Sequence, residues 1–384
     1  MDLDLNDQQR MLRDTTRQFA EQRLLPQAKA AEEAGTMAPE LRRELAAMGY
    51  CGIGTPERYG GSGLDAVSYA LMVSELSYGD ASVGVTVSVT NSLVQDPILM
   101  FGTEEQKQRY IPPLARGDVW GGFALTEPAA GTDAGGTRTT AVADGDHYVV
   151  NGAKSFVTNG GFADTFVVFV RGDREVKHGG ISAFIVERDT PGFAIGKHED
   201  KLGIRASSTT ELVFEDCRLP RANLLGEWGQ GFKVAMKTLD SGRIGIAAQA
   251  YGIAQRALDL AVKYAKERQQ FERPLSTFQH IQFRLADMAT DVEATRLLLL
   301  QAAFAKDAVA RNPGARYSPA AAMAKLFASE AAHRVVHQAL QIHGGYGYIK
   351  EFEIERLYRD QRITEIYEGT SEAMRMVIAA SLLK

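Results

Sequence analysis

The spacing of the apolar residues changes twice along the 384-residue chain, and this change constrains the fold more than any other feature. From about residue 5 to 115, apolar residues recur every three or four positions, which is the period of a helix packed on one face. From about 121 to 225 the period falls to two, in short runs rich in β-branched and aromatic residues. From about 230 onward the helical period returns. The order helix, strand, helix predicts an α+β protein.

The middle segment predicts a compact β domain. Its strand-like runs are separated by glycine-containing turns that supply positive φ angles, as at Asn151-Gly152 and Asn159-Gly160. The expected strands cover residues 147–150, 165–170, 181–186 and 212–214.

The last segment predicts a helical bundle. One apolar stripe runs from Ile244 to Ala265, and a second runs from Ile281 to Leu299. A turn is expected at residues 312–316, followed by a third helix from about Pro319 to Ile342. Gly344-Gly345 would end that helix with a left-handed cap, and a last helix would start after Gly369. Dividing the length by about 150 residues per domain gives roughly 2.6 domains. The changes in apolar spacing divide the chain into three, at residues 1–120, 121–228 and 229–384.

Composition excludes several classes of protein. With 43 basic and 48 acidic residues the net charge is −5, without the basic cluster expected of a nucleic-acid binder. The two cysteines, Cys51 and Cys217, can form neither a disulfide framework nor a four-thiolate zinc site, and they fit a reducing compartment. No apolar run reaches the ~18 residues that suggest a membrane span. The first residues predict neither a secretory signal nor an arginine-rich transit peptide, although a processed chain would look the same.

Two motifs suggest chemistry that their surroundings do not support. Residues 61–66 (GSGLDA) fit the loose dinucleotide pattern, but a Pro-containing loop precedes them where the phosphate-binding mechanism needs a strand. His333 and His337 have metal-ligand spacing on a predicted helix, but Arg334 stands where a zincin needs Glu, and no cysteine is near. We therefore expect a helix-to-helix loop at the first motif and no metal at the second.

Three further segments are ambiguous when each is read alone. Residues 125–133 (LTEPAAGTD) and 154–160 (KSFVTNG) offer small residues and hydroxyls that let backbone N–H groups approach a phosphate or a flavin edge, but each is also an ordinary turn. Glu368, just before the last helix, is either an acidic residue attracted to the helix N-terminus or a general base on a loop. On position alone, the first reading of Glu368 is favoured.

Taken together, the motifs resemble the acyl-CoA dehydrogenase family over essentially the whole chain. The resemblance rests on residues 125–133, on 156–160 (FVTNG), on 268–271 (RQQF), on 341–347 (QIHGGYG), and on 359–360 (RD) leading to 366–371 (IYEGTS). Within the family the chain looks most like the short-chain, butyryl-CoA branch. The family's fold is a helical N-terminal domain, a middle β-barrel or sandwich domain and a C-terminal four-helix bundle, which agrees with the texture found above.

The resemblance implies an FAD-dependent oxidoreductase that desaturates short- to medium-chain straight acyl-CoA thioesters to trans-2-enoyl-CoA. A carboxylate would remove the α-proton while the β-hydrogen leaves as hydride to the flavin. Carried over by position, Glu368 is the base. A positioned base supplies about 10²–10⁴-fold, so the remainder must come from hydrogen bonds that polarise the thioester carbonyl, including one from the Glu368 amide. Burial beside an acyl chain should raise the pKa of Glu368.

The resemblance also implies the binding residues, position by position. The flavin would be lined from the middle segment by Phe123, Leu125, Thr126, Thr132, Phe156 and Thr158. Residues that match positions reaching a flavin held by the neighbouring subunit are Arg268, Phe271, Gln279, Gln341, Gly344 and Gly345. Adenine-side contacts would come from Thr370 and Glu372. The acyl-CoA contacts would be Thr132, Asp240, Ser241, Gly242, Arg243, Tyr367 and Gly369.

Gly242 distinguishes branches of the family, because isovaleryl- and long-chain-type members carry their base at this position. Here the position has no side chain while Glu368 is present, which favours the straight-chain arrangement. Two departures leave reactivity with oxygen open: Phe156 stands where many members have Trp, and Ala129-Ala130 replaces a more usual glycine-containing pair. The alternatives are an acyl-CoA oxidase, a desulfinase or nitroalkane oxidase relative, or a non-catalytic flavin or acyl-CoA binding protein.

The resemblance to the family further implies partners and a location. Electrons would pass to an electron-transferring flavoprotein, and the chain would form a homotetramer built as a dimer of dimers. We expect a cytoplasmic bacterial protein, or a mitochondrial matrix protein if the sequence is a processed form.

Overall fold

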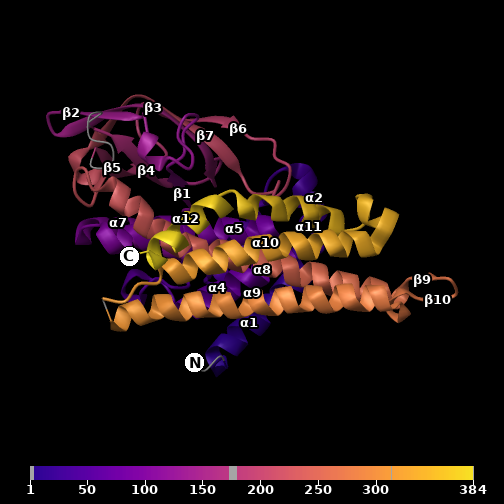
Figure 1. The fold of residues 1–384 in the computed structure, drawn as a ribbon. Coiled ribbons are helices and arrows are strands. Elements are labelled where there is room, and N and C mark those ends of the chain that lie inside the picture. Colours follow the sequence, from indigo (N-terminus) through magenta and orange to yellow (C-terminus); the bar gives the residue numbers. More distant parts are fainter. Residues whose placement is uncertain (1–3, 173–179, 313, 384) are drawn as a thin grey trace.

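A computed structural model describes residues 4–172, 180–312 and 314–383 of the chain (Figure 1). The helices form an elongated body, and the β domain lies against one end of it. The first helical group is α1 (Asp7–Phe19), α2 (Ala28–Ala34), α3 (Pro39–Ala47), α4 (Ala66–Gly79), α5 (Ala81–Ser88), α6 (Asp96–Phe101) and α7 (Glu104–Arg116). Wider π-helical turns occur at Ala20–Leu24 and at Val89–Gln95, and the second joins α5 to α6.

The β domain is an eight-stranded sheet in the order β6-β7-β3-β2-β4-β5-β8, with β1 paired in parallel to β4. Its strands are β1 (Gly121–Ala124), β2 (Thr140–Asp144), β3 (His147–Thr158), β4 (Thr165–Arg171), β5 (Ile181–Glu187), β6 (Phe193–His198), β7 (Thr209–Pro220) and β8 (Leu224–Leu225). Every residue of β4 is buried, as are all but the last of β5. This explains why these two strands read as continuous apolar runs rather than as alternating ones.

The second helical group contains the longest helices, α8 (Gly231–Glu267), α9 (Gln279–Arg311) and α10 (Ser318–His343), followed by α11 (Ile354–Gln361) and α12 (Ser371–Leu382). A small hairpin of β9 (Gln269–Gln270) and β10 (Arg273–Pro274) joins α8 to α9 at the end of the bundle away from the β domain (Figure 1). Buried alanines dominate α8 and α10, and small side chains allow close helix packing. The main apolar core therefore runs along α4, α8, α9 and α10.

The expected α+β architecture and the order of its parts are confirmed. The four expected strands lie within β3, β4, β5 and β7, and the expected helices lie within α8, α9, α10 and α12. Pro313, part of the expected turn, lies outside the described residues. Among the residues described, no helix combines the length and the apolar character needed to cross a bilayer. Cys51 and Cys217 are buried free thiols.

Gly344 departs from the expected left-handed cap. It has φ of 59° but ψ of −136°, so the chain leaves α10 in an extended direction that glycine alone readily adopts, rather than in the αL conformation. The turn that follows, Gly344–Tyr348, is a 3-10 helix. The turn after the cap packs against the end of α10, where a Cβ on Gly347 would lie 2.6 Å from the carbonyl oxygen of Leu340.

Candidate functional site

Glu368 lies on the short loop between α11 and α12, with its carboxylate turned into the protein. Its φ of 52° is in the left-handed region, which is uncommon for a residue with a side chain, and Gly369 follows with φ of 105°. The Oε2 atom of Glu368 is buried and has no hydrogen-bond partner among the residues that the structure describes. Burial raises the pKa of Glu368 to about 7, against the opposing charges of Lys325 and Arg243. A carboxyl group with this pKa can take up and release a proton near neutral pH.

Gly242 on α8 makes room for this carboxylate. A Cβ atom at position 242 would lie 2.0 Å from Oε2 of Glu368 and 2.8 Å from Cδ2 of Leu93. Its neighbours on α8 are buried: Nη1 of Arg243 lies 2.5 Å from Oδ1 of Asp240, and the Ser241 hydroxyl lies 3.2 Å from that of Tyr317. The structure thus brings the expected segment 240–243 to the expected base.

Tyr367 and Thr370 lie on either side of Glu368 in the loop. The hydroxyl of Tyr367 donates to Oε1 of Gln249, two turns beyond Gly242 on α8. Thr370 caps α12 by accepting a hydrogen bond from the Ala373 amide. Glu372, expected on the adenine side, lies exposed in the first turn of α12.

Lys325 is a residue of this site that the sequence motifs do not include. Its side chain is fully buried, and Nζ donates a 2.5 Å hydrogen bond to the carbonyl oxygen of Gly369. A signal was present in the sequence, because Lys325 occupies one position of the buried stripe of α10 that otherwise holds Ala321, Ala328 and Ala332. A lysine in an alanine stripe is unusual, since a buried ammonium group needs a partner.

The flavin residues expected from the middle segment gather at the start of the β domain. Phe123 lies on β1, and its ring centroid is 5.1 Å from that of Phe169. Leu125 and Thr126 follow β1, and the Thr126 carbonyl accepts the Ser155 amide at 2.8 Å. Phe156, with φ of 58°, and Thr158 lie on β3. Phe156 is 64% exposed, Thr158 is half-buried, and Thr132 lies exposed on the loop after β1.

A buried ion pair holds these two segments together. Nζ of Lys154 lies 2.6 Å from Oε1 of Glu127, and both side chains are almost completely buried. The Glu127 carboxylate also accepts the backbone amides of Arg138 and Thr139. Burial lowers the pKa of Lys154 to about 8, while Glu127 opposes the effect. The pair fixes the loop after β1 against β3, so that the residues expected to face a flavin keep one arrangement.

The residues expected to reach a flavin held by a neighbouring subunit form a second flavin set. They lie at the opposite end of the helical body, near the β9–β10 hairpin (Figure 1). A pocket of about 500 Å³ is lined there by Tyr264, Arg268, Gln270, Leu275, Ile342, His343, Gly344, Gly345, Tyr346 and Ile349. Nothing lies within 4 Å of where a Cβ would stand on Gly344 or Gly345, so the surface beside them is open. Phe271 at the hairpin is 87% exposed, and Gln279 and Gln341 are also exposed. One chain therefore does not bring its two flavin sets together.

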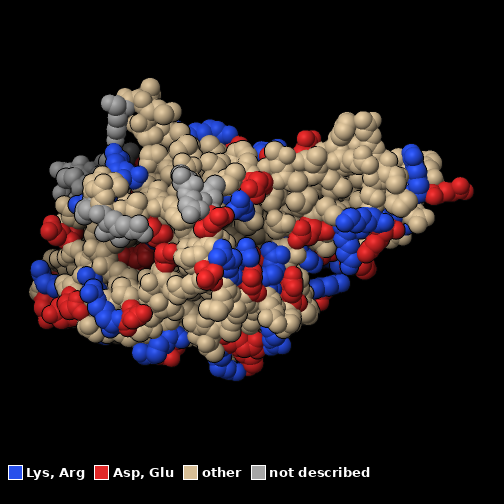
Figure 2. All heavy atoms as spheres, turned by 90° about the horizontal axis from the view of Figure 1, so that it is seen from below, with Lys and Arg blue, Asp and Glu red and all other residues tan. Residues whose placement is uncertain are grey.

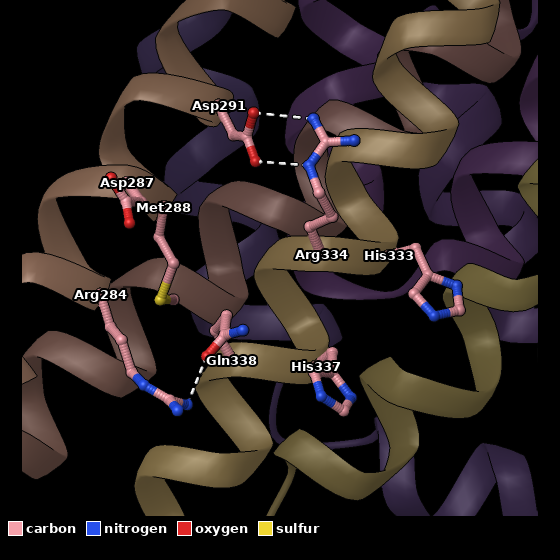
Figure 3. A pocket seen from close by; sticks show the side chains of 8 residues that line it. All are labelled: Arg284, Asp287, Met288, Asp291, His333, Arg334, His337 and Gln338. Atoms are coloured by element: carbon pink, nitrogen blue, oxygen red, sulfur yellow. Dashed lines mark hydrogen bonds and ion pairs between the residues drawn. The ribbon is translucent and has the colours of Figure 1, made fainter.

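The pocket around His333 and His337 has a different character (Figure 3). It is an open hollow on α9 and α10 lined by Arg284, Asp287, Met288, Asp291, His333, Arg334, His337 and Gln338. Arg334 makes a bidentate ion pair with Asp291. Nδ1 of His333 lies 2.9 Å from Oε1 of Glu365. Within the described ranges no group of His, Cys, Asp and Glu could hold a metal ion.

The loop at residues 61–66 joins a 3-10 turn, Glu57–Tyr59, to α4. No strand precedes its glycines in the described part of the chain, so the nucleotide-binding geometry is absent here. Asp65 instead caps α4 by accepting the Ser68 amide. On the face seen in Figure 2, basic and acidic side chains are interspersed. That face offers no continuous basic patch of the kind that binds a nucleic-acid backbone.

Comparison with known protein families matches three domain profiles along the chain. The acyl-CoA dehydrogenase N-terminal domain matches residues 6–118, the middle domain 122–217 and the C-terminal domain 229–383. The short-chain specific acyl-CoA dehydrogenase of Rattus norvegicus mitochondria is 52% identical over 382 residues, covering 100% of this chain and 92% of the relative.

Two solved structures match over their full length and over all of this chain. The butyryl-CoA dehydrogenase of Megasphaera elsdenii superposes with a TM-score of 0.97 at 48% identity. A chain from a study of the electron transferring flavoprotein of Acidaminococcus fermentans superposes with a TM-score of 0.97 at 52% identity.

Proposed function

The chain belongs to the acyl-CoA dehydrogenase family, FAD-dependent oxidoreductases, and we propose that its substrates are short, straight-chain acyl-CoA thioesters with Glu368 as the base. The observation that carries the proposal is the buried, unpartnered Oε2 of Glu368 beside Gly242. A carboxylate with a pKa of about 7 is matched to removing a proton at neutral pH. The alternative interpretation, an acidic residue attracted to the N-terminus of α12, gives no reason for a buried carboxylate oxygen without a partner.

The residues of this chain prepare proton removal in three ways. The enclosed carboxylate is poorly hydrated, so it is a stronger base than an exposed glutamate. Contact with Gly242 and Leu93 limits where Oε2 can lie, which orients it toward one bound α-carbon. Arg243 and Lys325 place positive charge near the site, which opposes protonation of the resting carboxylate.

The arrangement of the chain fits FAD. Thr126, Phe156 and Thr158 would line the flavin ring from the β domain, where an exposed aromatic ring and a hydroxyl stand on a rigid strand. Bound FAD would accept the β-hydrogen as hydride while Glu368 holds the α-proton. Arg268, Gln341 and Gly344 would hold the FAD of a neighbouring subunit. The pocket lined by Arg268 and Gly344 offers the guanidinium of Arg268, the amide of Gln270 and an open glycine backbone, a donor set suited to phosphate and ribityl oxygens.

The separation of the two flavin sets supports assembly from several copies of the chain. Large exposed side chains at the end of the bundle, Phe271 and Tyr348, give a second copy apolar surface to cover. We propose a homotetramer, made as a dimer of dimers, with domains at residues 1–120, 121–228 and 229–384. The matched domain profiles support that division.

The bacterial relative of known structure supports a cytoplasmic location, and the rat relative supports a mitochondrial matrix location for a processed chain. An electron-transferring flavoprotein is the proposed acceptor. The similarity to a chain from the Acidaminococcus study supports this choice.

A panel of straight acyl-CoA thioesters, from C4 to C12, tests the substrate proposal. The protein is mixed with each thioester without oxygen, and bleaching of the flavin absorbance is followed. The fastest bleaching is expected with butyryl-CoA, with rates falling along the series. No bleaching with any member would overturn the proposal. Peroxide release in air at the rate of flavin turnover would instead show an oxidase, the reactivity that Phe156 leaves open.

A further inference from the structure

Lys325 is a buried charge beside Glu368, and the proposed reaction uses it only as one of two nearby positive charges. It lies on α10, its side chain is 0% exposed, and its Nζ reaches the loop that carries Glu368. Burying an ammonium group is costly unless a hydrogen bond and a nearby negative charge compensate. Burial lowers the pKa of Lys325 to about 8, so the group stays mostly protonated at pH 7.

The first function of this ammonium is geometric. Glu368 has a positive φ, a conformation that is strained for a residue with a side chain and persists only where the surroundings hold it, whereas Gly369 adopts its positive φ readily. The 2.5 Å hydrogen bond from Nζ of Lys325 to the Gly369 carbonyl ties the residue next to the strained Glu368 to α10. On the other side the loop is held by the Thr370 cap of α12. The two contacts fix the direction in which the Glu368 side chain leaves the backbone.

The second function is electrostatic. The charged groups that act on Lys325 are Glu368 on the loop, Arg243 on α8, Glu365 at the end of the preceding 3-10 turn and Glu372 on α12. Two positive charges lower the pKa of Glu368 against the effect of burial, and Lys325 has a larger effect than Arg243. The tyrosine hydroxyls near Glu368 are those of Tyr367 and Tyr69. Within the described part of the chain, Oε2 of Glu368 nevertheless has no hydrogen-bond partner. Lys325 thus acts on the carboxylate through space and leaves this oxygen open to a substrate.

We propose that Lys325 is a positioning residue that holds the Glu368–Gly369 loop in its strained form and supplies the charge that keeps Glu368 ready to accept a proton. This inference rests on Glu368 being the base. Lys325, which lies on α10 outside the family motifs, would thus take part in proton removal.

The test compares two substitutions in the FAD-loaded protein. Lys325→Gln removes the charge but keeps an amide that can donate to the Gly369 carbonyl, and Lys325→Arg keeps the charge. If Lys325→Gln does not fold, Lys325→Met, which also removes the charge, replaces it. The measured quantity is the single-turnover rate of flavin reduction by butyryl-CoA without oxygen, from pH 5.5 to 9.5. Lys306→Gln serves as a control, because it removes a lysine that pairs with Asp96 and that is not among the charges acting on Glu368.

The rate of flavin reduction should rise with pH as Glu368 loses its proton. Loss of the Lys325 charge should move this rising limb of the pH–rate profile to higher pH. For Lys325→Gln we expect a shift of about one pH unit, hence a roughly tenfold lower rate at pH 6.5 with a plateau above pH 9 within about threefold of the parent. Lys325→Arg and Lys306→Gln should keep the parent limb. A role limited to stability would lower the rate by one factor at every pH and leave the limb in place, and that result would overturn the proposal.

A second readout does not depend on turnover. The infrared band of a protonated carboxyl group can be assigned to Glu368 by subtracting the spectrum of Glu368→Gln. The subtraction also removes the band of Asp360, a second buried carboxyl group whose pKa burial raises to about 7. This band should persist to higher pH in Lys325→Gln than in the parent, and an unchanged titration would contradict the proposal. If Glu368→Gln itself still reduced the flavin, the proposed base would be wrong. An inactive Glu368→Gln with an unshifted Lys325→Gln would reject only the role of Lys325.

Discussion

The carboxylate of Glu368 lies where the side chain of residue 242 would stand if that residue were not glycine. A methyl group on Gly242 would come within 2.0 Å of Oε2, a distance at which one of the two groups must move. Glu368 belongs to the loop before α12 and Gly242 to the middle of α8, 126 positions earlier in the chain. The site therefore has room for one carboxylate, and it enters from the loop.

Substitution Gly242→Ala should displace the Glu368 carboxylate without removing it. Because Leu93 also lies within 2.8 Å of the new methyl group, the carboxylate has to turn away from its present position. We expect kcat/KM to fall by about 10²-fold, since misplacing a reacting group by about 1 Å has this effect. Flavin content and steady-state kinetics with butyryl-CoA measure it.

Gly245→Ala, one turn along α8, is the matched control for Gly242→Ala. Its methyl group would meet the hydroxyls of Ser88 and Tyr69 rather than Glu368. This variant should lose stability but keep most of its kcat. Equal losses of kcat/KM in the two variants would show that the contact with Glu368 has no special importance.

Glu368 should make the protein less stable as pH rises. Its pKa is about 7 in the folded chain and near 4.5 when unfolded, so the folded state binds more protons between these values. The stabilisation is complete below pH 4.5 and is lost as pH rises through 7, a change of about 3 kcal/mol. Glu368→Gln removes the titration. Its melting temperature should exceed that of the parent by a few degrees at pH 8, with the difference shrinking toward pH 5, and a constant difference would contradict the raised pKa.

The Lys154–Glu127 pair predicts a linked loss of stability and of flavin. Lys154→Met leaves a buried carboxylate with only its two backbone donors, Arg138 and Thr139. Breaking one side of a buried pair typically costs about 3–5 kcal/mol. Thermal unfolding and flavin absorbance should both show the loss, and the double variant Lys154→Met, Glu127→Gln should recover part of it. A double variant no better than Lys154→Met would show that the unpaired charge is not the cause.

The two surface pockets should differ in their effect on FAD. Arg268 lines the pocket at the hairpin and Arg284 lines the pocket on α9 and α10. Arg268→Ala should weaken FAD retention by roughly tenfold or more, because a charge-assisted bond to phosphate is lost. Arg284→Ala should not. Dialysis followed by flavin absorbance compares them, and equal retention would argue against FAD in the hairpin pocket.

The sequence predicted the architecture because its local signals agree with the packing. The buried strands β4 and β5 read as apolar runs, and the stripe on α8 marks the face that contacts α4 and α10. The conformation of Gly344 was less predictable, since a glycine after a helix permits positive φ but does not choose ψ. The role of Glu368 was also ambiguous locally, because its burial depends on α8 and α10, which lie far from it in sequence.

Lys325 shows the limit of motif reading most clearly. Its contact with the Gly369 carbonyl joins α10 to a loop 44 positions later, and no short pattern records such a distance. The available signal was a charge in a buried stripe, which predicts that a partner exists but not which one. The two flavin motifs were also hard to combine from the sequence. Residues 125–133 and 341–347 lie at opposite ends of the folded molecule, so one chain does not bring them together.

Anaerobic flavin reduction in Glu368→Gln tests the central claim most directly. The variant keeps the volume of the side chain but has no carboxylate to accept the α-proton. We predict that it retains the yellow flavin absorbance of the parent, and that butyryl-CoA, which bleaches the parent, leaves the variant oxidised or reduces it at least about 10²-fold more slowly. Bleaching of the variant at the rate of the parent would show that the base is not Glu368.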